Sequence, residues 1–414
     1  MDETKLNVKK TMYFSFGFFA VSLAWALYNA YVPIILRGEH FNLNNTQVGF
    51  IMVIDNLAAV ILEPTFGHLS DRTRTRFGRR MPYIYVGIPA AAAAFIVLPF
   101  MYHLWSLMPV LILFCVIMAT WRTPVISLMP DLTPGPLRSQ ANGIVNLFGG
   151  LGALLAFAGG GLLRKAGGYP LVFLTGAFVM LLALVVLMAK VREPQQAYAV
   201  DEPPPRVRLT PAERKSLLLI LFAIFFWFVG YSPVETYFTL FATRTLGMSE
   251  SNAPILLGVF SIALIAFAVP AGFLGARFGR RKLIMIGLVG VVVMFLPMIL
   301  GAGVTVTAAC LFGGGLFWAC ININSLPMVV RVGGERLFGT FVGYYYLFSV
   351  SAQIVAPPSV GRLIDLAGDN YRVLFVFSCV GFVLALAVLL FVRHGEDTAP
   401  ETTTAAESLA ALGE

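Results

Sequence analysis

The chain has 414 residues, of which 58% are hydrophobic and only 12% are charged, and its mean hydropathy is +0.82. Soluble domains carry roughly 25% charged residues, so the composition excludes a water-soluble globular fold. The net charge of +8 is spread over short loops between apolar runs. No basic soluble domain remains that could bind nucleic acid. The composition therefore predicts a polytopic protein of the lipid bilayer.

Apolar runs of about twenty residues recur twelve times, and this length crosses a hydrocarbon layer of about 30 Å. We expect an all-α membrane protein with twelve transmembrane helices in two six-helix bundles. The first run is too long for the core of a signal peptide, so we expect it to remain as the first helix. The expected spans are residues 11–36, 45–68, 81–101, 106–129, 139–163, 170–190, 217–242, 252–275, 282–300, 304–330, 338–362 and 372–392.

A polar, proline-rich stretch divides the twelve runs into two sixes. Thr210, Pro211 and Glu213 match an N-cap, a proline at the first helical position and the acid of a capping box. This pattern predicts that a helix starts there. The expected parts are an N-terminal bundle (1–192), a cytoplasmic linker (193–212), a C-terminal bundle (213–394) and a disordered cytoplasmic tail (395–414).

The lysines and arginines predict the orientation in the membrane. If the N-terminus is inside, 22 of the 29 fall in segments on that side, 6 fall on the other side, and Arg122 lies within a span. Positive residues favour the cytoplasmic side, so we expect both termini in the cytoplasm and the protein in the inner (plasma) membrane. The four cysteines lie in apolar runs without the spacing of a zinc or disulfide framework. We therefore expect no metal and no cofactor.

Two echoes within the sequence indicate that the halves are repeats. A pattern of six residues in the fifth run recurs two hundred residues later, and the loop 67–80 is echoed by 272–281. Parallel repeats of this kind are typical of secondary transporters. The recurring residues are Gly143, Leu147, Phe148, Ala156, Gly161 and Leu163, which match Gly343, Leu347, Phe348, Ala356, Gly361 and Leu363, together with 77–80, which match 278–281.

The segment 63–83 reads EPTFGHLSDRTRTRFGRRMPY. It resembles the loop between helices 2 and 3 of the major facilitator superfamily, and in particular that of the sucrose/proton and glycoside/cation symporters. Residues 129–134, with Arg138 and Asn142-Gly143 after them, are similar to the next cytoplasmic loop in bacterial relatives of the sucrose carriers. The resemblance implies the major facilitator fold and symport of a sugar, a disaccharide or glycoside, with H⁺ or alternatively Na⁺. The chain departs from the pattern of plant sucrose carriers at Arg122, where those carriers look to have glutamine.

The same loop supplies a candidate cytoplasmic gate. Asp71 lies where the second helix meets water, so its carboxylate can accept hydrogen bonds from an arginine or a helix N-terminus. The resemblance implies that this cluster latches the halves together in the outward-facing state. The alternative is that the arginines only orient the protein. The candidate gate residues are Gly67, Asp71, Arg72, Gly78, Arg79, Arg80, Asp131 and Arg138.

Four ionisable residues inside the spans are candidates for proton coupling: Asp55, Glu63, Arg122 and Glu235. A charge at the bilayer centre costs about 2.5 to 3.5 kcal/mol on insertion scales, so such residues are default functional candidates. Glu63 and Arg122 lie at similar depth, so they can form an ion pair, which serves either coupling or structure. We expect Asp55 to face a central cavity. Glu235 lies nearer the outside, where it meets either solute or the interface.

A sugar is bound by aromatic rings under its C–H faces and by amides and carboxylates at its hydroxyls. The central helices offer both residue types, so we expect a small polar solute, a sugar, as the partner of a monomeric carrier. The alternative for any single tryptophan or tyrosine is packing between helices. The candidate binding residues are Trp25, Tyr28, Asn29, Asn56, Trp121, Asn322, Asn324, Tyr344 and Gln353.

Other functions find less support in the sequence. No Gly-Lys pair occurs, so the phosphate-binding loop of an ATP-driven pump is missing. No cluster of nucleophile, base and orienting acid is visible, so we do not expect an enzyme. Two alternatives stay open: a proton-driven efflux antiporter for amphipathic compounds, which would prefer a less polar cavity, and a sugar sensor that does not transport.

Overall fold

The structure is a computed structural model that describes residues 6–134, 137–193, 209–333 and 338–392. Within these ranges the chain forms helices joined by short loops, and no extended strand occurs. Most of the expected linker, from 194 to 208, and the expected tail lie outside the described residues. Their structure therefore stays a prediction.

The helices match the expected spans to within a few residues. They are α1 (Val8–Arg37), α2 (Asn45–Met52), α3 (Ile54–Arg72), α4 (Met81–Val97), the 3₁₀ turn η1 (Leu98–Phe100), α5 (Leu104–Leu132), α6 (Arg138–Lys190), α7 (Pro211–Arg244), α8 (Ala253–Phe278), α9 (Arg280–Ile299), α10 (Val304–Gly333), α11 (Phe338–Leu366) and α12 (Val373–Leu389).

Ten helical segments are long and apolar enough to cross a membrane, if α2 and α3 are counted together as one span (Asn45–Arg72). The shorter apolar α12 follows them. The segment α6 counts twice, because its 53 residues would extend about 80 Å as one helix. It turns at Gly167 and Gly168, where Gly168 adopts a φ of 71° that a side chain disfavours. The described chain thus contains the twelve expected spans.

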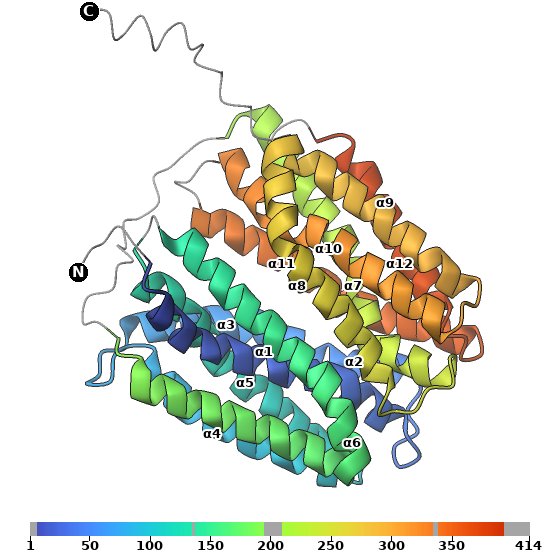
Figure 1. The fold of residues 1–414 in the computed structure, drawn as a ribbon, viewed down its shortest axis with the longest axis horizontal. Coiled ribbons are helices and arrows are strands. Elements are labelled where there is room, and N and C mark those ends of the chain that lie inside the picture. The colour runs from blue at the N-terminus through green and yellow to red at the C-terminus, as the bar shows by residue number, and fades with distance from the viewer. Residues whose placement is uncertain (1–5, 135–136, 194–208, 334–337, 393–414) are drawn as a thin grey trace, which may run out of the picture.

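The two halves have the same internal packing. In the N-terminal half α1 packs along α6, and α5 packs on α3 and α4; in the C-terminal half α7 packs along α12, and α10 packs on α8 and α9. Figure 1 shows the halves as two bundles, with α1 to α6 in blue and green beside α7 to α12 in yellow to red. They meet where α11 packs on α2, α6 on α8 and α1 on α7.

Local backbone geometry confirms both the repeat and the restart after the linker. Gly78 has a φ of 107° and Gly279, its counterpart in the second half, has a φ of 95°. At the start of α7, Thr210 and Glu213 form the predicted capping box, in which each side chain accepts a hydrogen bond from the backbone N–H of the other. Pro211 occupies the first turn, as expected.

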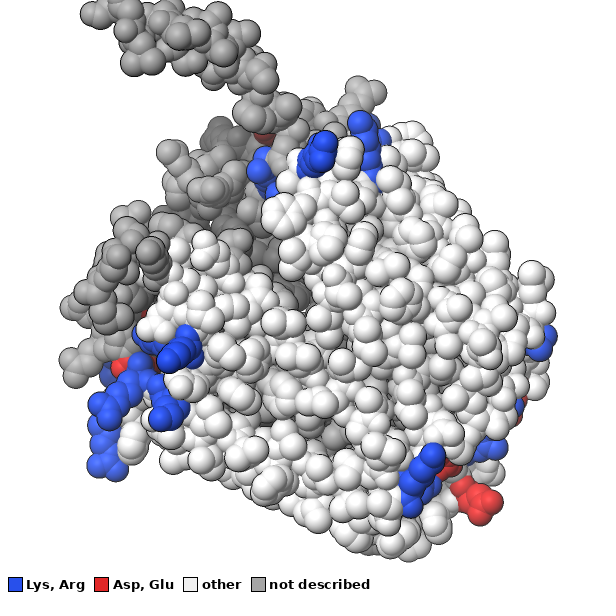
Figure 2. Space-filling view, viewed as in Figure 1, with Lys and Arg blue, Asp and Glu red and all other residues white. Residues whose placement is uncertain are grey.

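Charged residues gather at the two ends of the bundles. Figure 2 shows a wide uncharged band on this face, with Lys and Arg at its two sides, as a hydrocarbon layer requires. We call the end that carries the start of α1 and the α3–α4 loop the basic end, because this loop alone holds Arg74, Arg76, Arg79 and Arg80. The other end is called the opposite end.

Close helix contacts generate a first prediction. A side chain at Gly287 of α9 would place its Cβ 2.7 Å from the backbone oxygen of Phe317 in α10. Overpacking of this kind costs about 1 to 3 kcal/mol. We therefore expect Gly287→Val to lower the thermal unfolding temperature of the purified protein in detergent by several degrees. Gly159→Val is the control, because a Cβ there meets nothing within 4 Å; equal unfolding temperatures for the two variants would contradict the packing described here.

Candidate transport site

The predicted ion pair between Glu63 and Arg122 is present. Arg122 Nη1 lies 2.8 Å from Glu63 Oε1, and the two side chains keep 34% and 26% of their surface exposed. The close packing of α3 on α5 brings them together, and a Cβ at Gly67 would lie only 3.2 Å from Thr123. Two charges in the spans are therefore paired without being sealed from solvent.

Charged and polar groups of both halves meet around this pair. Tyr346 of α11, which is 53% exposed, lies within electrostatic range of both Glu63 and Arg122. Asp55 and Glu235 in turn lie within range of Arg122 and of each other. The four candidates for coupling thus form one group between the halves.

Asp55 stands at a break in the second span. Val53 interrupts the helix, so Asp55 lies in the first turn of α3, where the helix dipole stabilises a negative charge. Its Oδ1 accepts hydrogen bonds from the backbone N–H of Asn56 at 2.6 Å and from the Asn56 amide at 2.8 Å. The Asn56 side chain, expected to bind solute, is therefore engaged with Asp55.

Asn29 and Glu235 join the halves, each in the part of its helix nearer the opposite end. The Asn29 amide of α1 donates to Glu235 Oε1 of α7 at 3.0 Å. One turn nearer the basic end, Trp25 follows the same face of α1, and Tyr231 follows the same face of α7. Tyr231 stacks on Trp318 of α10, with ring centroids 4.1 Å apart and an interplanar angle of 6°.

Three predicted binding residues take part in packing in this conformation, and their contact with a solute stays a prediction. Tyr28 is fully buried beside Phe114. Trp121 is fully buried against Gly87 of α4. Adjacent residues of a helix point about 100° apart, so Trp121 points away from the direction in which Arg122 meets Glu63. The Asn324 amide donates to the backbone oxygen of Ala271 in α8 at 3.1 Å.

The three remaining candidates differ in position. Asn322 is exposed one turn beyond Trp318 on α10. Gln353 is half-buried and lies two turns from Tyr346 on the same face of α11. Tyr344 is exposed but lies about 160° around α11 from Tyr346, which the sequence analysis did not select. The spacing of seven residues between Tyr346 and Gln353 was the signal that could have identified Tyr346.

The predicted gate residues gather at the basic end. Arg80 is buried; its Nε lies 2.8 Å from Asp131 Oδ2, and its guanidinium also pairs with Asp71. Arg79 Nη2 lies 2.8 Å from Asp131 Oδ1. Arg138 lies beside them and donates to the backbone oxygen of Pro130 at 3.1 Å. Arg72 is exposed, and Gly67 accepts from Arg80 Nη1 at 3.3 Å.

Glu193 completes this cluster, although the sequence analysis placed it in the linker. Its carboxylate accepts hydrogen bonds from the backbone N–H groups of Arg80 at 2.9 Å and Met81 at 3.3 Å, so it caps α4. Burial raises the pKa of the Glu193 carboxyl. Gly78 needs its positive φ here, and a side chain at Gly78 would collide with Glu193.

At the basic end, the cluster joins residues of the N-terminal half to one another. Each of these contacts, as far as the chain is described, joins residues of that half alone. In the second half the counterpart of Arg80, Arg281, donates to the backbone oxygens of Leu389 at 3.0 Å and Leu390 at 2.7 Å. None of these described contacts forms a latch between the halves.

The opposite end is closed by bonds between the halves. Asp365 of α11 accepts hydrogen bonds from the backbone N–H groups of Asn45 and Thr46, each at 2.9 Å. Tyr237 of α7 donates to the backbone oxygen of Asn45 at 2.7 Å. Further bonds join Arg37 to Asp369, Arg164 to Glu250, Tyr169 to Glu250 and Tyr371 to Asn45.

Near the basic end, two exposed glycines, one in each half, have no close neighbours among the described residues. A Cβ built on Gly143 of α6 or on its repeat counterpart, Gly343 of α11, meets nothing within 4 Å. The residues of the ion pair keep part of their surface exposed. The described bonds therefore close the opposite end, while the ion pair keeps part of its surface exposed.

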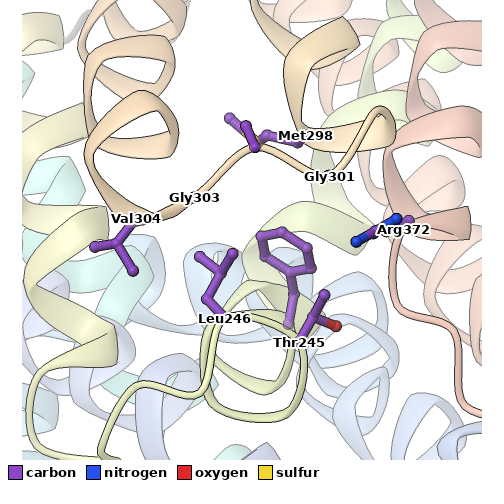
Figure 3. Close-up of a pocket in the computed structure, with 9 residues that line it drawn as sticks. Thr245, Leu246, Met298, Gly301, Gly303, Val304 and Arg372 are labelled. Carbon is purple, nitrogen blue, oxygen red and sulfur yellow. The ribbon is translucent and has the colours of Figure 1, made fainter.

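A separate small pocket of about 260 Å³ lies at the opposite end, within the C-terminal half. The end of α7, the α9–α10 loop and Arg372 surround it (Figure 3). Leu246, Met298 and Val304 contribute apolar side chains to its lining, and Arg372 is the one charged residue that lines it. It lies outside the group of charges between the halves.

Two repeated six-helix bundles, closed at one end and holding charges between them, define a membrane transporter. The sequence profile described as "Major Facilitator Superfamily" matches residues 14–254 and 236–412. The chain therefore belongs to this superfamily, as the α2–α4 segment predicted, and it is not an enzyme.

Similar proteins have several substrates. The isoprimeverose transporter of Lactiplantibacillus pentosus is 24% identical over 299 residues, which are 66% of this chain and 60% of that protein. The Multi-drug resistance efflux pump PmrA homolog of Lactococcus lactis is 25% identical over 410 residues, 95% of this chain and 97% of that protein. A solved bacterial homolog of the human lysosomal transporter Spinster, inward-facing and unoccupied, has a TM-score of 0.71 at 16% identity and covers 93% of this chain and 94% of its own.

The ion pair generates a second prediction. Glu63→Leu leaves Arg122 without its carboxylate, and Arg122→Leu leaves Glu63 without its cation, so each single variant strands a charge among the helices. Because a quarter to a third of each side chain is exposed, we expect each to cost about 1 to 2 kcal/mol of stability. The double Leu variant should recover most of the loss in thermal unfolding. Additive losses in the double variant would show that the two groups do not interact.

Glu193 generates a third prediction. Because its pKa in the folded protein is raised, its contribution to stability is largest at low pH and is lost as pH rises above the usual glutamate range of about 4.3. Glu193→Gln removes this titration. The unfolding temperature of the variant, relative to that of the unchanged protein, should therefore increase from about pH 4 to about pH 7. A relative decrease over that range would contradict the assignment.

Proposed function

We propose that the protein is a secondary active transporter that carries a small polar solute, a sugar of the disaccharide or glycoside class, together with a proton. The observation that carries this proposal is the Glu63–Arg122 pair, partly exposed and within range of Tyr346 in the other half. A protonatable acid is thereby linked to an arginine at the place where the two halves meet.

Protonation of Glu63 would couple the proton to the solute. A neutral carboxyl no longer attracts the guanidinium, so Arg122 becomes free to donate hydrogen bonds to solute hydroxyls. Proton binding then raises solute affinity, and by linkage solute binding raises proton affinity. One proton moving through 100 mV supplies about 2.3 kcal/mol, which supports a solute gradient of roughly fiftyfold.

Alternating access would expose this site to each side in turn. The basic end is the cytoplasmic end if the excess of positive residues orients the protein, so the conformation described here is open to the cytoplasm. The bonds of Asp365, Asp369 and Glu250 would break when the opposite end opens. The cluster around Arg80 and Asp131 would then contact the second half as the basic end closes.

Four observations bear on the solute. The relative named as an isoprimeverose transporter supports a sugar, and so do the asparagine, carboxylate and aromatic side chains that line the meeting of α1 and α7. The multidrug efflux relative aligns with nearly the whole chain and supports efflux of amphipathic compounds as the second candidate. The three acidic residues of the group, Asp55, Glu63 and Glu235, favour a polar solute over an apolar one.

Transport in proteoliposomes tests the proposal. We expect labelled isoprimeverose to accumulate when an inward proton gradient is imposed and to leak out when a protonophore collapses it. Glu63→Gln keeps the shape of the side chain but cannot titrate, so it should retain sugar exchange at equal concentrations and lose accumulation. Glu39→Gln, at an exposed position of the opposite end, is the control and should behave like the unchanged protein.

Three outcomes would contradict the proposal. Accumulation that survives the protonophore would reject proton coupling, and accumulation driven by a sodium gradient would replace the proton with Na⁺. Exclusion of amphipathic dyes without any sugar exchange would favour the efflux antiporter.

A further inference from the structure

The small pocket at the opposite end of the C-terminal half is lined by the side chain of Arg372. Among the described residues the guanidinium of Arg372 donates no hydrogen bond and pairs with no acid; only its backbone N–H is engaged, with Asn370 Oδ1 at 3.2 Å. The acid of the same loop, Asp369, pairs with Arg37 instead. Arg372 can therefore donate charge-assisted hydrogen bonds to a ligand. We call this cavity the Arg372 pocket.

Gly301 of the α9–α10 loop fixes the position of the guanidinium. A Cβ on Gly301 would lie 2.8 Å from Nη2, 3.0 Å from Cζ and 3.1 Å from Nη1 of Arg372. Three such similar distances mean that the plane of the guanidinium faces the loop. Gly301 also has a φ of 93°, which favours glycine. The loop thus covers one face of the group, and the N–H donors along its edge stay available.

The other polar groups of the Arg372 pocket can also donate hydrogen bonds. Gly303 and Val304 lie at the start of α10, where backbone N–H groups have no partner within the helix. Thr245, at the end of α7, contributes a hydroxyl that makes no hydrogen bond to a described residue. All nine residues that line the pocket are described, and no acid is among them. The chemistry of the pocket is therefore that of a site for an oxyanion.

Two rows of exposed apolar residues lead along α9 and α12 to this pocket. Within each row the residues are three or four positions apart, so they share one face of their helix, and between 45% and 84% of each residue is exposed. The α9 row ends directly before Gly301, and Arg372 lies one turn before the first residue of the α12 row. The rows are Ile286, Val289, Val293, Leu296 and Leu300 on α9 and Val376, Val380 and Val383 on α12.

The two rows belong to the outside of the C-terminal bundle. The helices α9 and α12 pack on each other, and Figure 1 shows them on the side of this bundle that faces away from α1 to α6. Exposed apolar surface on a membrane-spanning helix contacts acyl chains. The Arg372 pocket therefore lies at the level where these chains end and lipid headgroups begin.

The volume of the pocket limits what it can hold. About 260 Å³ is less than the roughly 300 to 1,000 Å³ of pockets that enclose a drug-sized molecule. In Figure 3 Arg372 stands on one side of this space and Val304 on the other, with the loop between Gly301 and Gly303 above it. The pocket thus fits a small charged group, and the rest of a larger ligand must lie outside.

We propose that the Arg372 pocket binds the phosphate of an anionic phospholipid in the leaflet at the opposite end. Arg372 donates two parallel hydrogen bonds to phosphate oxygens, the start of α10 and the Thr245 hydroxyl donate further bonds, and the acyl chains lie along the rows on α9 and α12. This site is separate from the passage between the halves. It goes beyond the proposed transport and does not depend on which solute is carried.

Native mass spectrometry of the full chain in detergent tests the site. Phosphatidylglycerol should be retained in preference to phosphatidylcholine with the same acyl chains, because the lone arginine favours a headgroup with net negative charge. In Arg372→Gln the affinity for phosphatidylglycerol should fall about tenfold, since hydrogen bonds to a charged group are lost. Arg372→Lys keeps the charge without the parallel bonds and should fall between the two.

Arg362→Gln is the matched control. Arg362 is another exposed arginine near the same end of the C-terminal half, and it does not line the pocket. The substitution removes the same charge, and the affinity for phosphatidylglycerol should stay that of the unchanged protein. Without lipid, both glutamine variants should unfold at the temperature of the unchanged protein, so that a loss of binding does not reflect a loss of structure.

A phosphatidylglycerol with a photoactivatable diazirine in its acyl chain tests where the chains lie. Crosslinks should map to α9 and α12 in the unchanged protein and should decrease in Arg372→Gln. Crosslinks spread evenly over the other helices would contradict the placement.

Three further results would overturn the proposal. Equal losses in Arg372→Gln and Arg362→Gln would assign the binding to general surface charge. Equal retention of phosphatidylglycerol and phosphatidylcholine would remove the role of the headgroup charge. Glycerol 1-phosphate that binds through Arg372 as tightly as phosphatidylglycerol, measured by titration calorimetry, would make the ligand a soluble anion in place of a lipid.

Discussion

The cost of an ionised side chain in hydrocarbon is the constraint on which the rest of this structure depends. Glu63, Arg122, Asp55 and Glu235 lie within membrane spans, and each would be penalised by several kcal/mol if it faced lipid alone. The structure meets this cost by pairing Arg122 with Glu63 and by gathering all four groups where the halves meet. The positions of these four charged residues therefore indicate where a passage between the halves would lie.

The arrangement of bonds at the two ends follows from this need for a wet passage. At the opposite end Asp365, Asp369 and Glu250 of the second half accept hydrogen bonds from the first half. At the basic end Asp131 and Glu193 hold the arginines of the α3–α4 loop within one half. The same kinds of group thus join the halves at one end and act within one half at the other, as the proposed alternating access would require.

Sequence predicted the features that depend on spacing along the chain. Hydropathy located the spans, because each needs about twenty apolar residues, and helical rise placed Glu63 and Arg122 at one depth. Features that depend on which neighbour a helix face meets were missed. The sequence did not show that Tyr346 lies near the ion pair, that Trp121 points into its own bundle, or that Glu193 caps a helix more than a hundred residues away. Periodicity along one helix does not reveal such partners.

The central claim is that the group of charges borders water that enters from the basic end. A single cysteine at Tyr346, beside the Glu63–Arg122 pair, tests it most directly. A charged, membrane-impermeant thiol reagent added on the basic side of oriented membrane vesicles should label this cysteine, and the same reagent on the opposite side should not. Labelling only by a lipid-soluble maleimide, from both sides alike, would place the group against acyl chains and contradict the account.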